Sequence, residues 1–423
     1  MQSLRWTSEL KDFPASGFEL IETTTKIEEE TLPGYTPETF YPVQQGEIMN
    51  DQYQVNSKIG YGATSTVWLA RDLIESKYVT IKVYARNKGK EHEINVYNHM
   101  QTIETDHPGK QHVRKLLNHF VIQGPNGRHV CLVYEPLGMS LYELECISKN
   151  LGVVEPIPRL EDAKPVIRRL LSALDYLHQV PGLIHADLHM RNLLMPGPSS
   201  DRISEYEKRV IDYPLARKVL DDRTIYSTRM FPTGRGLPVL CDLGEAQFGN
   251  KENNGRIMID QHRAPEVILW CENWDYKVDI WGVAMLAWDL ASTRRLIQDH
   301  EIEGIWNDGG HIAELNALLG PPPLEFVKQY HMSWIFWDES GTWTNRVPIP
   351  DRTLEQAAAD VEGEDVEDIL RWLRRALQWN PRDRATPMEL LFDPWLMKGM
   401  KLKRGCQAPK EYPHLIGVVE VVD

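Results

Sequence analysis

The pattern of hydrophobic and polar positions between about residues 50 and 140 is mainly that of β-strands. β-branched and aromatic residues flank a short glycine-containing turn, which predicts strands within Tyr53–Leu73 and Tyr78–Arg86. A further apolar run, His129–Gly138, predicts a buried strand that ends in a Pro-Gly connection. Between them, Ile94 and the apolar positions that follow it at helical spacing predict a helix within Lys90–Ile103.

The pattern of the later residues is helical. Lys164–Val180 and Val366–Trp379 carry apolar residues at spacings of three and four, which predicts two amphipathic helices. Asp279–Ser292 is apolar almost all round and predicts a buried helix. A small β-rich part followed by a larger helical part predicts an α+β fold with two lobes.

These patterns divide the chain into four stretches. Residues 1–50 are acidic and interrupted by prolines, and their lack of periodicity predicts a mostly irregular extension. We expect a β-rich lobe over residues 51–137, a helical lobe over residues 138–398 and a tail over residues 399–423.

The composition is that of a soluble globular protein, with 42% hydrophobic and 26% charged residues among 423. No apolar run reaches the roughly 18 residues that a membrane span needs, and the N-terminus lacks the apolar core of a signal peptide. Five cysteines without a Cys-x-x-Cys pair fit a reducing compartment, so we expect an intracellular protein of the cytoplasm, the nucleus or both. A net charge of -14 disfavours direct binding to nucleic acid and is compatible with basic partners.

A glycine-containing turn and a lysine form the first candidate site. Glycines in the turn Gly60–Ser65 let the backbone approach phosphate groups, although a plain hairpin turn explains the same residues. Lys82 lies inside an apolar strand and therefore needs an anionic partner, either phosphate or a helix glutamate. Glu93 and Glu91 compete for that role, and we prefer Glu93 because Ile94 and Tyr97 then pack beside it.

Three oxygen-bearing side chains form the second candidate site. Asp187 and Asn192 have a spacing that serves phosphoryl transfer, and Asp242 follows an apolar strand, where a Mg²⁺ ligand would be held. A lone Asp-x-Gly is more often a turn, and His185 and His189 are explained as a buried and a loop histidine. A zinc site is disfavoured because a third ligand at suitable spacing is missing.

In chain order the motifs resemble those of a eukaryotic protein kinase over about residues 53–396. They are GYGATS, VTIKV, Glu93, HADLHMRN, DLG, HRAPE (His262–Glu266), DIWG (Asp279–Gly282) and NPRDRAT (Asn380–Thr386). Small-molecule kinases share the Asp-Asn pair but lack an activation segment that closes on Ala-Pro-Glu. They also lack the later arginine, here Arg384, which pairs with that glutamate, here Glu266, in the protein kinase fold.

The resemblance implies ATP and Mg²⁺ as cofactors and a role for each matching residue. Lys82 would hold the α- and β-phosphates with Glu93 orienting it, Asp187 would orient the substrate hydroxyl, and Asn192 and Asp242 would hold Mg²⁺. The other expected ATP-binding residues are Ile59, Gly60, Gly62, Ser65, Val67, Tyr134 and the backbone of Glu135 and Leu137, and the expected structural residues are Glu266, Asp279 and Arg384.

Finer features resemble the SR-protein kinases, especially the fungal kind. Gly309–Pro323 looks like the helical insert shared with cyclin-dependent and mitogen-activated kinases, and KIGYGATSTVWLARD, CLVYEPLG, DLGEA and DPWL are similar to SR-protein kinases. About 50 residues separate Asn192 from Asp242, which implies a short version of that family's insert at about residues 196–237.

Several positions depart from the family pattern. His189 replaces the lysine that contacts the γ-phosphate in the family. The small Ala186 before Asp187, where most kinases have arginine, is by contrast as in the SR-protein kinases. Arg294 and Arg295 stand where the family places an acid of the groove that docks Arg/Ser-rich substrates, and Asp308 would keep part of that groove.

The sequence therefore predicts an active, monomeric Ser/Thr protein kinase of the SR-protein kinase type with a role in mRNA splicing control. Its partners would be proteins with Ser or Thr in a basic, Arg/Ser-rich context, without direct nucleic-acid or membrane binding. The first alternative is a kinase-like scaffold with weak or no catalysis, for which His189 is the support. The second, less favoured alternative is a small-molecule kinase.

Overall fold

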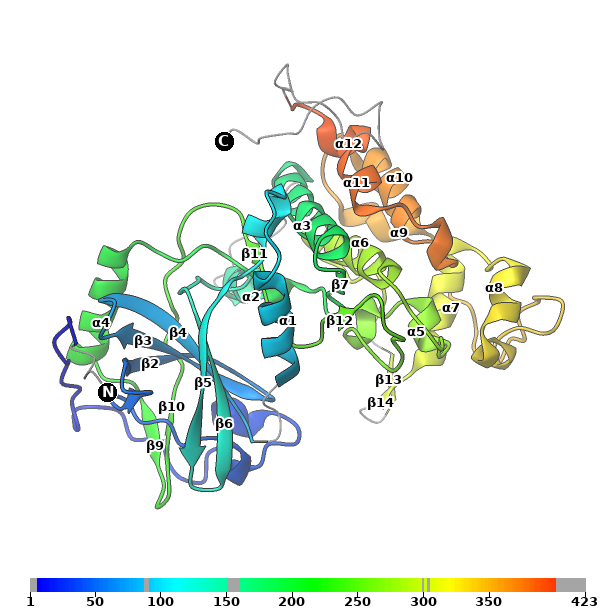
Figure 1. Cartoon of the computed structure of the whole chain (residues 1–423). Helices are drawn as coiled ribbons and strands as arrows, with labels where there is room; N and C mark the ends of the chain where they lie inside the picture. The colour runs from blue at the N-terminus through cyan, green and yellow to red at the C-terminus, as the bar shows by residue number, and fades with distance from the viewer. Residues whose placement is uncertain (1–5, 87–90, 151–159, 299, 303–304, 401–423) are drawn as a thin grey trace. The chain divides into compact units, whose positions relative to one another are not determined.

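The computed structural model describes residues 6–86, 91–150, 160–298, 300–302 and 305–400, and these residues form two compact units (Figure 1). The β-rich unit comprises residues 1–104, 113–150 and 191–244, and the helical unit comprises residues 105–112, 151–190 and 245–423. The N-terminal extension and the segment between Asn192 and Asp242 thus belong to the β-rich unit. The sequence pattern instead separates the extension from both lobes and assigns that segment to the helical lobe. Most of the expected C-terminal tail lies outside the described residues.

An antiparallel sheet of six strands forms the core of the β-rich unit. The strands lie in the order β1-β2-β3-β4-β6-β5, and a two-residue turn joins β2 to β3. Alternating apolar residues on these strands pack into one buried cluster that includes Val55, Trp68, Ile81 and Val133. The strands are β1 (Ile48–Met49), β2 (Tyr53–Gly62), β3 (Ser65–Asp72), β4 (Lys77–Tyr84), β5 (Leu116–Gly124) and β6 (Gly127–Tyr134).

The one helix expected among these strands is α1 (Glu91–Gln101), and its buried residues are Glu93, Val96, Tyr97 and Met100. A buried glutamate on an otherwise apolar helix face requires hydrogen-bonding partners, which the sheet supplies as described below. A second helix, α2 (Leu141–Asn150), follows β6.

The segment between Asn192 and Asp242 folds onto the strands of the β-rich unit, as the green elements in Figure 1 show. It forms α4 (Ser200–Asp212), β9 (Arg217–Val219) and β10 (Thr224–Tyr226). The buried Glu207 of α4 accepts hydrogen bonds from Asn56 at 3.0 Å, Arg71 at 2.7 Å and Tyr78 at 3.0 Å, which lie on three consecutive strands. One carboxylate therefore holds this helix to the sheet.

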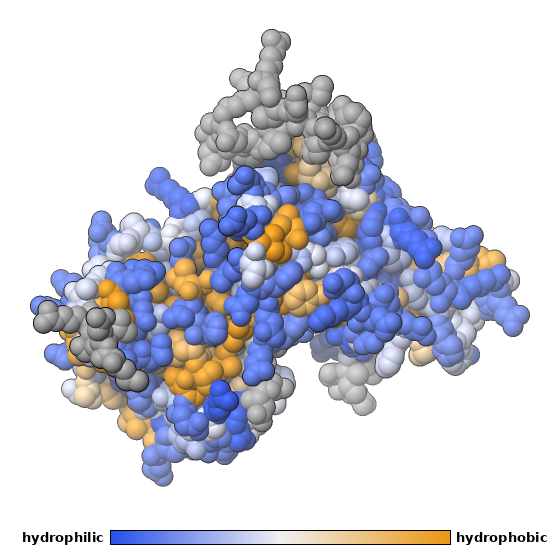
Figure 2. All heavy atoms as spheres, viewed as in Figure 1, coloured by the Kyte–Doolittle hydropathy of each residue, from blue (hydrophilic) through white to orange (hydrophobic). Residues whose placement is uncertain are grey.

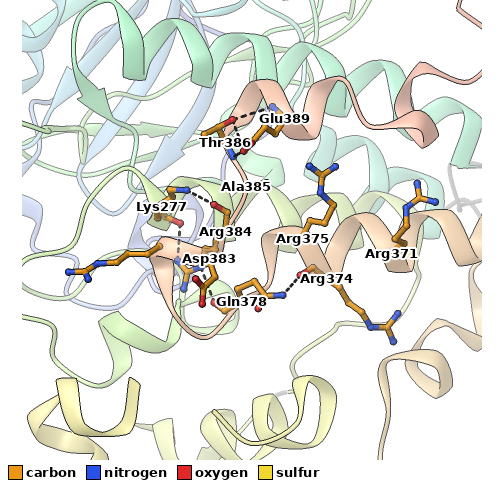
Figure 3. A pocket seen from close by; sticks show the side chains of 11 residues that line it. Lys277, Arg371, Arg374, Arg375, Gln378, Asp383, Arg384, Ala385, Thr386 and Glu389 are labelled. Atoms are coloured by element: carbon orange, nitrogen blue, oxygen red, sulfur yellow. Dashed lines mark hydrogen bonds between the residues drawn. The ribbon is translucent and has the colours of Figure 1, made fainter. Parts of the chain in front are cut away.

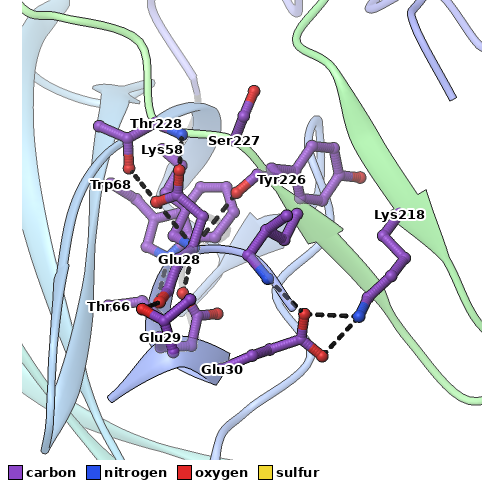
Figure 4. Close-up of polar contacts among 12 residues, drawn as sticks. Glu28, Glu29, Glu30, Lys58, Thr66, Trp68, Lys218, Tyr226, Ser227 and Thr228 are labelled. Atoms are coloured by element: carbon purple, nitrogen blue, oxygen red, sulfur yellow. Dashed lines mark hydrogen bonds and ion pairs between the residues drawn. The ribbon is translucent and has the colours of Figure 1, made fainter. Parts of the chain in front are cut away.

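The N-terminal extension is irregular except for β1 and two short 3₁₀ helices, η1 (Glu28–Thr31) and η2 (Pro37–Thr39). Its acidic run Glu28–Glu30 contacts two buried lysines, as Figure 4 shows. Lys58 of β2, which is 1% exposed, pairs with Glu29 and lies 3.6 Å from Glu28, while Lys218 of β9 pairs with Glu30. The run thus connects the extension to both the sheet and the β9–β10 hairpin.

Three helices of the helical unit correspond to those that the sequence predicts. They are α3 (Leu160–Gln179), α6 (Lys277–Ala291) and α10 (Val366–Ala376), and α6 is buried almost all round, as its apolar sequence predicts. The other helices are α5 (Pro265–Ile268), α7 (Asp308–Leu319), α8 (Leu324–Gln329), α9 (Leu354–Ala357), α11 (Pro387–Leu391) and α12 (Pro394–Met397), with 3₁₀ helices η3 (Pro108–His112) and η5 to η8 (Asp260–His262, His331–Ile335, Ala358–Asp360, Pro381–Asp383).

Short two-stranded pairs position the loops that carry the candidate site. In the β-rich unit β8 (Leu193–Leu194) pairs with β11 (Val239–Leu240), and in the helical unit β7 (Leu183–Ile184) pairs with β12 (Gln247–Phe248). The helical unit also contains the pair β13 (Glu301–Ile302) and β14 (Ile305–Trp306), and the 3₁₀ helix η4 spans Met190–Asn192.

The visible surface is largely polar, with an apolar area over the part of the sheet where β5 lies (Figure 2). Leu117 and Val121 of this strand are 39% and 44% exposed. Among the described residues, we find no helix with the length and apolar character of a membrane span.

Candidate active site

The glycine-containing turn is the tip of the β2–β3 hairpin. Gly62 pairs with Ser65 and Gly60 with Val67 across the two strands. A Cβ atom built on Gly62 would meet nothing within 4 Å, and one on Gly60 would meet only Val67 at 3.6 Å. Packing within the described chain therefore does not require glycine at position 62, and the open space beside its backbone fits a ligand that approaches closely.

Lys82 of β4 lies between two carboxylates of the same unit. Its Nζ atom is 3.0 Å from Oδ2 of Asp242 and 3.9 Å from Oε2 of Glu93, and its side chain is 15% exposed. Burial opposes the charged lysine, but the charges of Asp242 and Glu93 outweigh it and hold the pKa of Lys82 well above the ordinary value. The lysine is thus a fixed cation, and Glu93, not Glu91, is the glutamate near it.

Two tyrosines hold the carboxylate of Glu93, which is fully buried on α1. The hydroxyl of Tyr84 donates to one oxygen of Glu93, and that of Tyr134 donates to the other at 3.0 Å. Burial is the main reason that the pKa of both tyrosines is raised, so they remain neutral donors. The sheet thereby fixes the orientation of α1 and satisfies its buried charge.

The residues expected to border adenine lie at the end of β6 and directly after it. Tyr134 is 2% exposed, and its ring lies 4.1 Å from the guanidinium of Arg114. The same guanidinium donates to the backbone oxygen of Glu135 at 3.2 Å. A carbonyl oxygen has two lone pairs, so that of Glu135 retains one acceptor site.

Asn192 and Asp242 come together because β8 and β11 are paired. Asn192 directly precedes β8, Asp242 lies two residues beyond the end of β11, and the backbone nitrogen of Cys241 donates to the oxygen of Asn192 at 2.8 Å. Asp242 has a φ of 62°, and its Oδ1 atom accepts from the nitrogen of Gly244 at 3.1 Å. An amide and a carboxylate oxygen at one strand end match the hard-oxygen ligands of Mg²⁺, with phosphate oxygens supplying the rest.

The carboxylate of Asp279 on α6 binds the backbone of the loop that carries Asp187. This buried carboxylate accepts from the backbone nitrogens of His185 at 2.8 Å and Ala186 at 2.9 Å and from the ring of His178 at 2.8 Å. Ala186 adopts a φ of 65°, a conformation that is costly for a residue with a Cβ atom. The hydrogen bonds to Asp279 stabilise this turn and leave the side chain of Asp187 24% exposed.

Glu266 and Arg384 form a fully buried, bidentate ion pair in the helical unit. The two nitrogen-oxygen distances are both 2.6 Å, and Arg384 also donates to the backbone oxygens of Gln378 and Lys277. Figure 3 shows Arg384, which lies in the loop between α10 and α11, beside Lys277 at the start of α6. Loss of one partner from such a pair costs about 3–5 kcal/mol, so this pair fixes the start of α5, just after residues 248–263, to the loop between α10 and α11.

The protein kinase domain family matches residues 53–396. The chain belongs to this family. It is similar to a serine/threonine protein kinase of Aspergillus fumigatus, with 38% identity over 90% of this chain and 94% of the relative. A serine/threonine-protein kinase SRPK of Physarum polycephalum is 27% identical over 87% of this chain and 91% of the relative. A crystal structure of a kinase domain, 22% identical, covers 85% of this chain and 99% of that domain with a TM-score of 0.63, which shows the common fold.

In this protein serine/threonine kinase, His189 contacts Asp187. His189 stands where the family pattern has lysine, and its Nε2 atom lies 3.2 Å from Oδ2 of Asp187. The imidazole therefore contacts the carboxylate of Asp187 in the described structure, a geometry that the sequence alone did not indicate.

Charged residues hold the activation segment of the kinase, residues 248–263, to α7. Arg256 lies 2.9 Å from Asp308, and Arg263 lies 2.5 Å from Asp260 and 3.5 Å from Asp308. Burial raises the pKa of Asp308, which opposes ionisation, while the two arginines act in the opposite direction. Asp308, expected to be part of a docking groove, is therefore already bound by two arginines of its own chain.

Sequence reasoning did not identify three residues around the site: Tyr84, Arg114 and Asp289. Tyr84 lies two residues after Lys82, on the same face of β4, which is the signal that could have shown that it shares the environment of the lysine. Arg114 and Asp289 contact Tyr134 and His262 across long sequence distances, at 4.1 Å and 2.8 Å, and lack a comparable local signal.

Proposed function

We propose that this kinase is catalytically active and transfers the γ-phosphate of ATP to serine or threonine of proteins in the presence of Mg²⁺. The observation that carries the proposal is the placement of Lys82 between Glu93 and Asp242. A buried cation held by two carboxylates is prepared to bind phosphate, because its charge and position are already fixed.

Each remaining group would have one role in the transfer. Mg²⁺ bound by Asn192 and Asp242 would neutralise phosphate charge. Lys82 would position the α- and β-phosphates, and the β2–β3 turn would lie over them with the open side of Gly62. Asp187 would orient the substrate hydroxyl and accept its proton late in the transfer.

The proposed substrates are proteins with Ser or Thr in a basic context, and a role in mRNA splicing control rests on the similarity to SR-protein kinases. The net charge of -14 supports attraction of basic peptides. We propose further that long runs of phosphorylation along an Arg/Ser repeat are reduced. Arg294 and Arg295 are exposed, and Asp308 is occupied by Arg256 and Arg263.

The second candidate function is a kinase-like scaffold with weak or no catalysis. It is favoured by the contact between His189 and Asp187, because a histidine at this position lacks the permanent charge of lysine. The preserved Lys82, Glu93, Asn192 and Asp242 favour the enzyme, since loss of one polar contact reduces a rate more often than it abolishes it.

Replacement of Asp187 tests the enzyme against the scaffold. We expect Asp187→Asn to abolish phosphate transfer from radiolabelled ATP to a generic basic protein and to an Arg/Ser peptide, while binding of ATP persists. The exposed Asp351 offers a matched control in the helical unit, and Asp351→Asn should leave transfer unchanged. Transfer near the wild-type rate by Asp187→Asn would show that the active-site assignment is wrong, and absence of transfer by the wild-type protein would favour the scaffold.

A further inference from the structure

Trp270 is the most exposed large hydrophobic residue of the described chain, with an exposed fraction of 72%, and it lies just after α5 (Figure 1). Two other described tryptophans are exposed, but each has a partner. The indole of Trp6 donates to the backbone oxygen of Asp51 at 2.9 Å, and the guanidinium of Arg346 lies over the ring of Trp334 at 5.8 Å. Among the described residues, the side chain of Trp270 has no such partner.

The backbone of Trp270 occupies a position that is usually taken by glycine. The helix α5 ends in a Schellman motif, in which the nitrogen of Trp270 donates to the oxygen of Val267 at 3.3 Å and that of Cys271 to the oxygen of Glu266 at 2.9 Å. Trp270 has a φ of 58°, a left-handed conformation that is strained for a bulky residue. Because the side chain is exposed, packing within the chain does not offset this strain. A strained and exposed aromatic residue therefore points to a role in binding.

The loop that carries Trp270 is bonded to the activation segment. The side chain of Asn273 accepts from the backbone nitrogen of Asn253 at 2.7 Å. The backbone nitrogen of Trp274 donates to the oxygen of Asn253 at 2.9 Å, and its indole donates to the oxygen of Gly255 at 3.3 Å. Asn253 and Trp274 are both buried. Trp270 thus stands on a fixed loop beside the activation segment.

The carboxylates next to Trp270 make this part of the surface acidic. Burial is the first cause that raises the pKa of the thiol of Cys271, and the charges of Glu266, Asp275 and Glu272 raise it further. Asp275 and Glu272 are exposed. The three carboxylates therefore lie close enough to the residue after Trp270 to act on it.

Two of these three carboxylates are already bound within the chain. Glu266 pairs with Arg384, and Asp275 accepts from the backbone nitrogen of Lys277 at 2.9 Å. The ammonium group of Lys277 donates to the backbone oxygen of Arg384. Glu272 has neither a hydrogen bond nor an ion pair from its side chain to another described residue. Its charge is therefore available to a cationic partner.

We propose that Trp270 and Glu272 bind one arginine side chain of a basic peptide. A planar guanidinium stacks on aromatic rings, of which tryptophan attracts a cation most strongly, and it also donates to carboxylates. Arg346 over Trp334 is the same kind of contact within the chain. The net charge of -14 supports a basic partner. This proposal deepens the proposed function and rests on it in one respect, namely that the peptide is a protein substrate.

A binding measurement without ATP tests the site directly. The probes are fluorescein-labelled Gly/Ala peptides that carry three arginines, three lysines or three uncharged citrullines, and they contain no Ser or Thr. Fluorescence anisotropy gives each Kd. We expect the arginine peptide to bind most tightly, because net charge alone would make arginine and lysine equal. Trp270→Gly should weaken binding of the arginine peptide about fivefold.

The glycine variant is expected to fold, which keeps the test decisive. Glycine adopts a φ near 58° without strain, so Trp270→Gly should unfold in urea at a midpoint at least as high as that of the wild-type protein. A weaker Kd with an unchanged or higher midpoint is then a loss of binding and not a loss of structure. Trp270→Phe should retain part of the binding, because the ring is retained.

Matched controls make the result specific. Trp334→Ala removes another exposed indole of the helical unit and should leave the Kd unchanged. Glu272→Gln should weaken binding of the arginine peptide, whereas Glu339→Gln, at an exposed position of the same unit, should not. Equal Kd values for the wild-type protein and Trp270→Gly, or for the arginine and citrulline peptides, would overturn the proposal. Tighter binding of an uncharged apolar peptide that depends on Trp270 would overturn it in favour of an apolar partner.

The same measurement beside the transfer assay separates this site from the proposed function. If the wild-type protein transfers no phosphate but the arginine peptide binds through Trp270 and Glu272, the proposed function fails and the site stands. If transfer is normal and peptide binding is insensitive to both residues, the site fails alone.

Discussion

At the scale of single residues, the contact between His189 and Asp187 leads to a prediction about the rate of phosphate transfer. A neutral imidazole offers one donor and lacks the permanent charge that a lysine would place near the γ-phosphate. We expect His189→Lys to raise the rate of transfer about tenfold if about 1.4 kcal/mol of transition-state stabilisation is gained. Steady-state kinetics on a basic peptide measures the rate of transfer, and ATP binding is a second readout.

An unchanged or lower rate in His189→Lys would have a different meaning. The Nε2 atom of His189 lies 3.2 Å from Oδ2 of Asp187, so the imidazole would then be a positioning group for the carboxylate rather than a weak substitute for lysine. His189→Gln distinguishes a positioning group from a weak substitute for lysine, because glutamine retains a donor without a charge.

The charged residues of the candidate site could be predicted from sequence for a physical reason. A lysine in an apolar strand and a carboxylate at a strand end are costly unless they have partners, so their presence alone predicts a site. The partners that satisfy them are harder to predict. The hydroxyls of Tyr84 and Tyr134 hold Glu93, and the backbone nitrogens of His185 and Ala186 bind a carboxylate more than 90 residues away.

At the scale of elements, the activation segment is held without a phosphate. Residues 248–263 contain no Ser, Thr or Tyr, and Ala186 cannot pair with a phosphate as arginine does. Ion pairs hold the segment instead, because Arg256 and Arg263 both contact Asp308 of α7. We therefore expect phosphatase treatment to leave the rate unchanged, with mass spectrometry to confirm removal of phosphate. A large loss of rate traced to phosphate in this segment would refute the prediction.

The acidic run Glu28–Glu30 is expected to stabilise the β-rich unit. Lys58 is 1% exposed, so its replacement by alanine leaves the nearby carboxylates of Glu28 and Glu29 without their cation. Breaking such a buried pair costs about 3–5 kcal/mol. Lys58→Ala should thus lower the midpoint of urea unfolding strongly.

Lys77 is the control for Lys58, because it lies on β4 of the same sheet and pairs with Glu75 in an exposed position. Exposed pairs contribute about 0–1 kcal/mol, so Lys77→Ala should change the midpoint little. Similar midpoints for the two variants would show that the acidic run does not stabilise the unit.

The elements themselves were predicted where the pattern is strong and missed where it is short. The strands around Lys82 and the helices α3, α6 and α10 follow from their periodicity. The β9–β10 hairpin consists of two strands of three residues and produces no distinct pattern. The helix α4 carries Ile203, Tyr206 and Val210 at helical spacing, a signal that the sequence analysis did not use. Their position depends on Glu207 and on contacts with the sheet, which are distant in sequence.

At the scale of the whole molecule, charge acts at two ranges. A net charge of -14 attracts basic peptides over a Debye length of about 8 Å at physiological salt, which raises the rate of encounter. The local charge at Arg294 and Arg295 is opposite, so a substrate arginine that reached it would meet a like charge. Fast encounter and short residence together predict single phosphorylation events on basic peptides.

Reversal of the local charge should therefore change processivity without changing the chemistry. We expect Arg294→Asp with Arg295→Gly to tighten binding of an Arg/Ser-repeat peptide and to increase the number of phosphates added per encounter, while the rate on a single-site peptide stays the same. Mass spectrometry after dilution into excess unlabelled peptide counts the phosphates added before release. Arg346→Asp, which reverses the charge of an exposed arginine elsewhere in the helical unit, is the control. If the wild-type kinase already adds many phosphates to one repeat and the double replacement changes nothing, Arg294 and Arg295 do not meet the substrate. Asp308 would then remain the residue to test, because an incoming arginine would have to displace Arg256 from it.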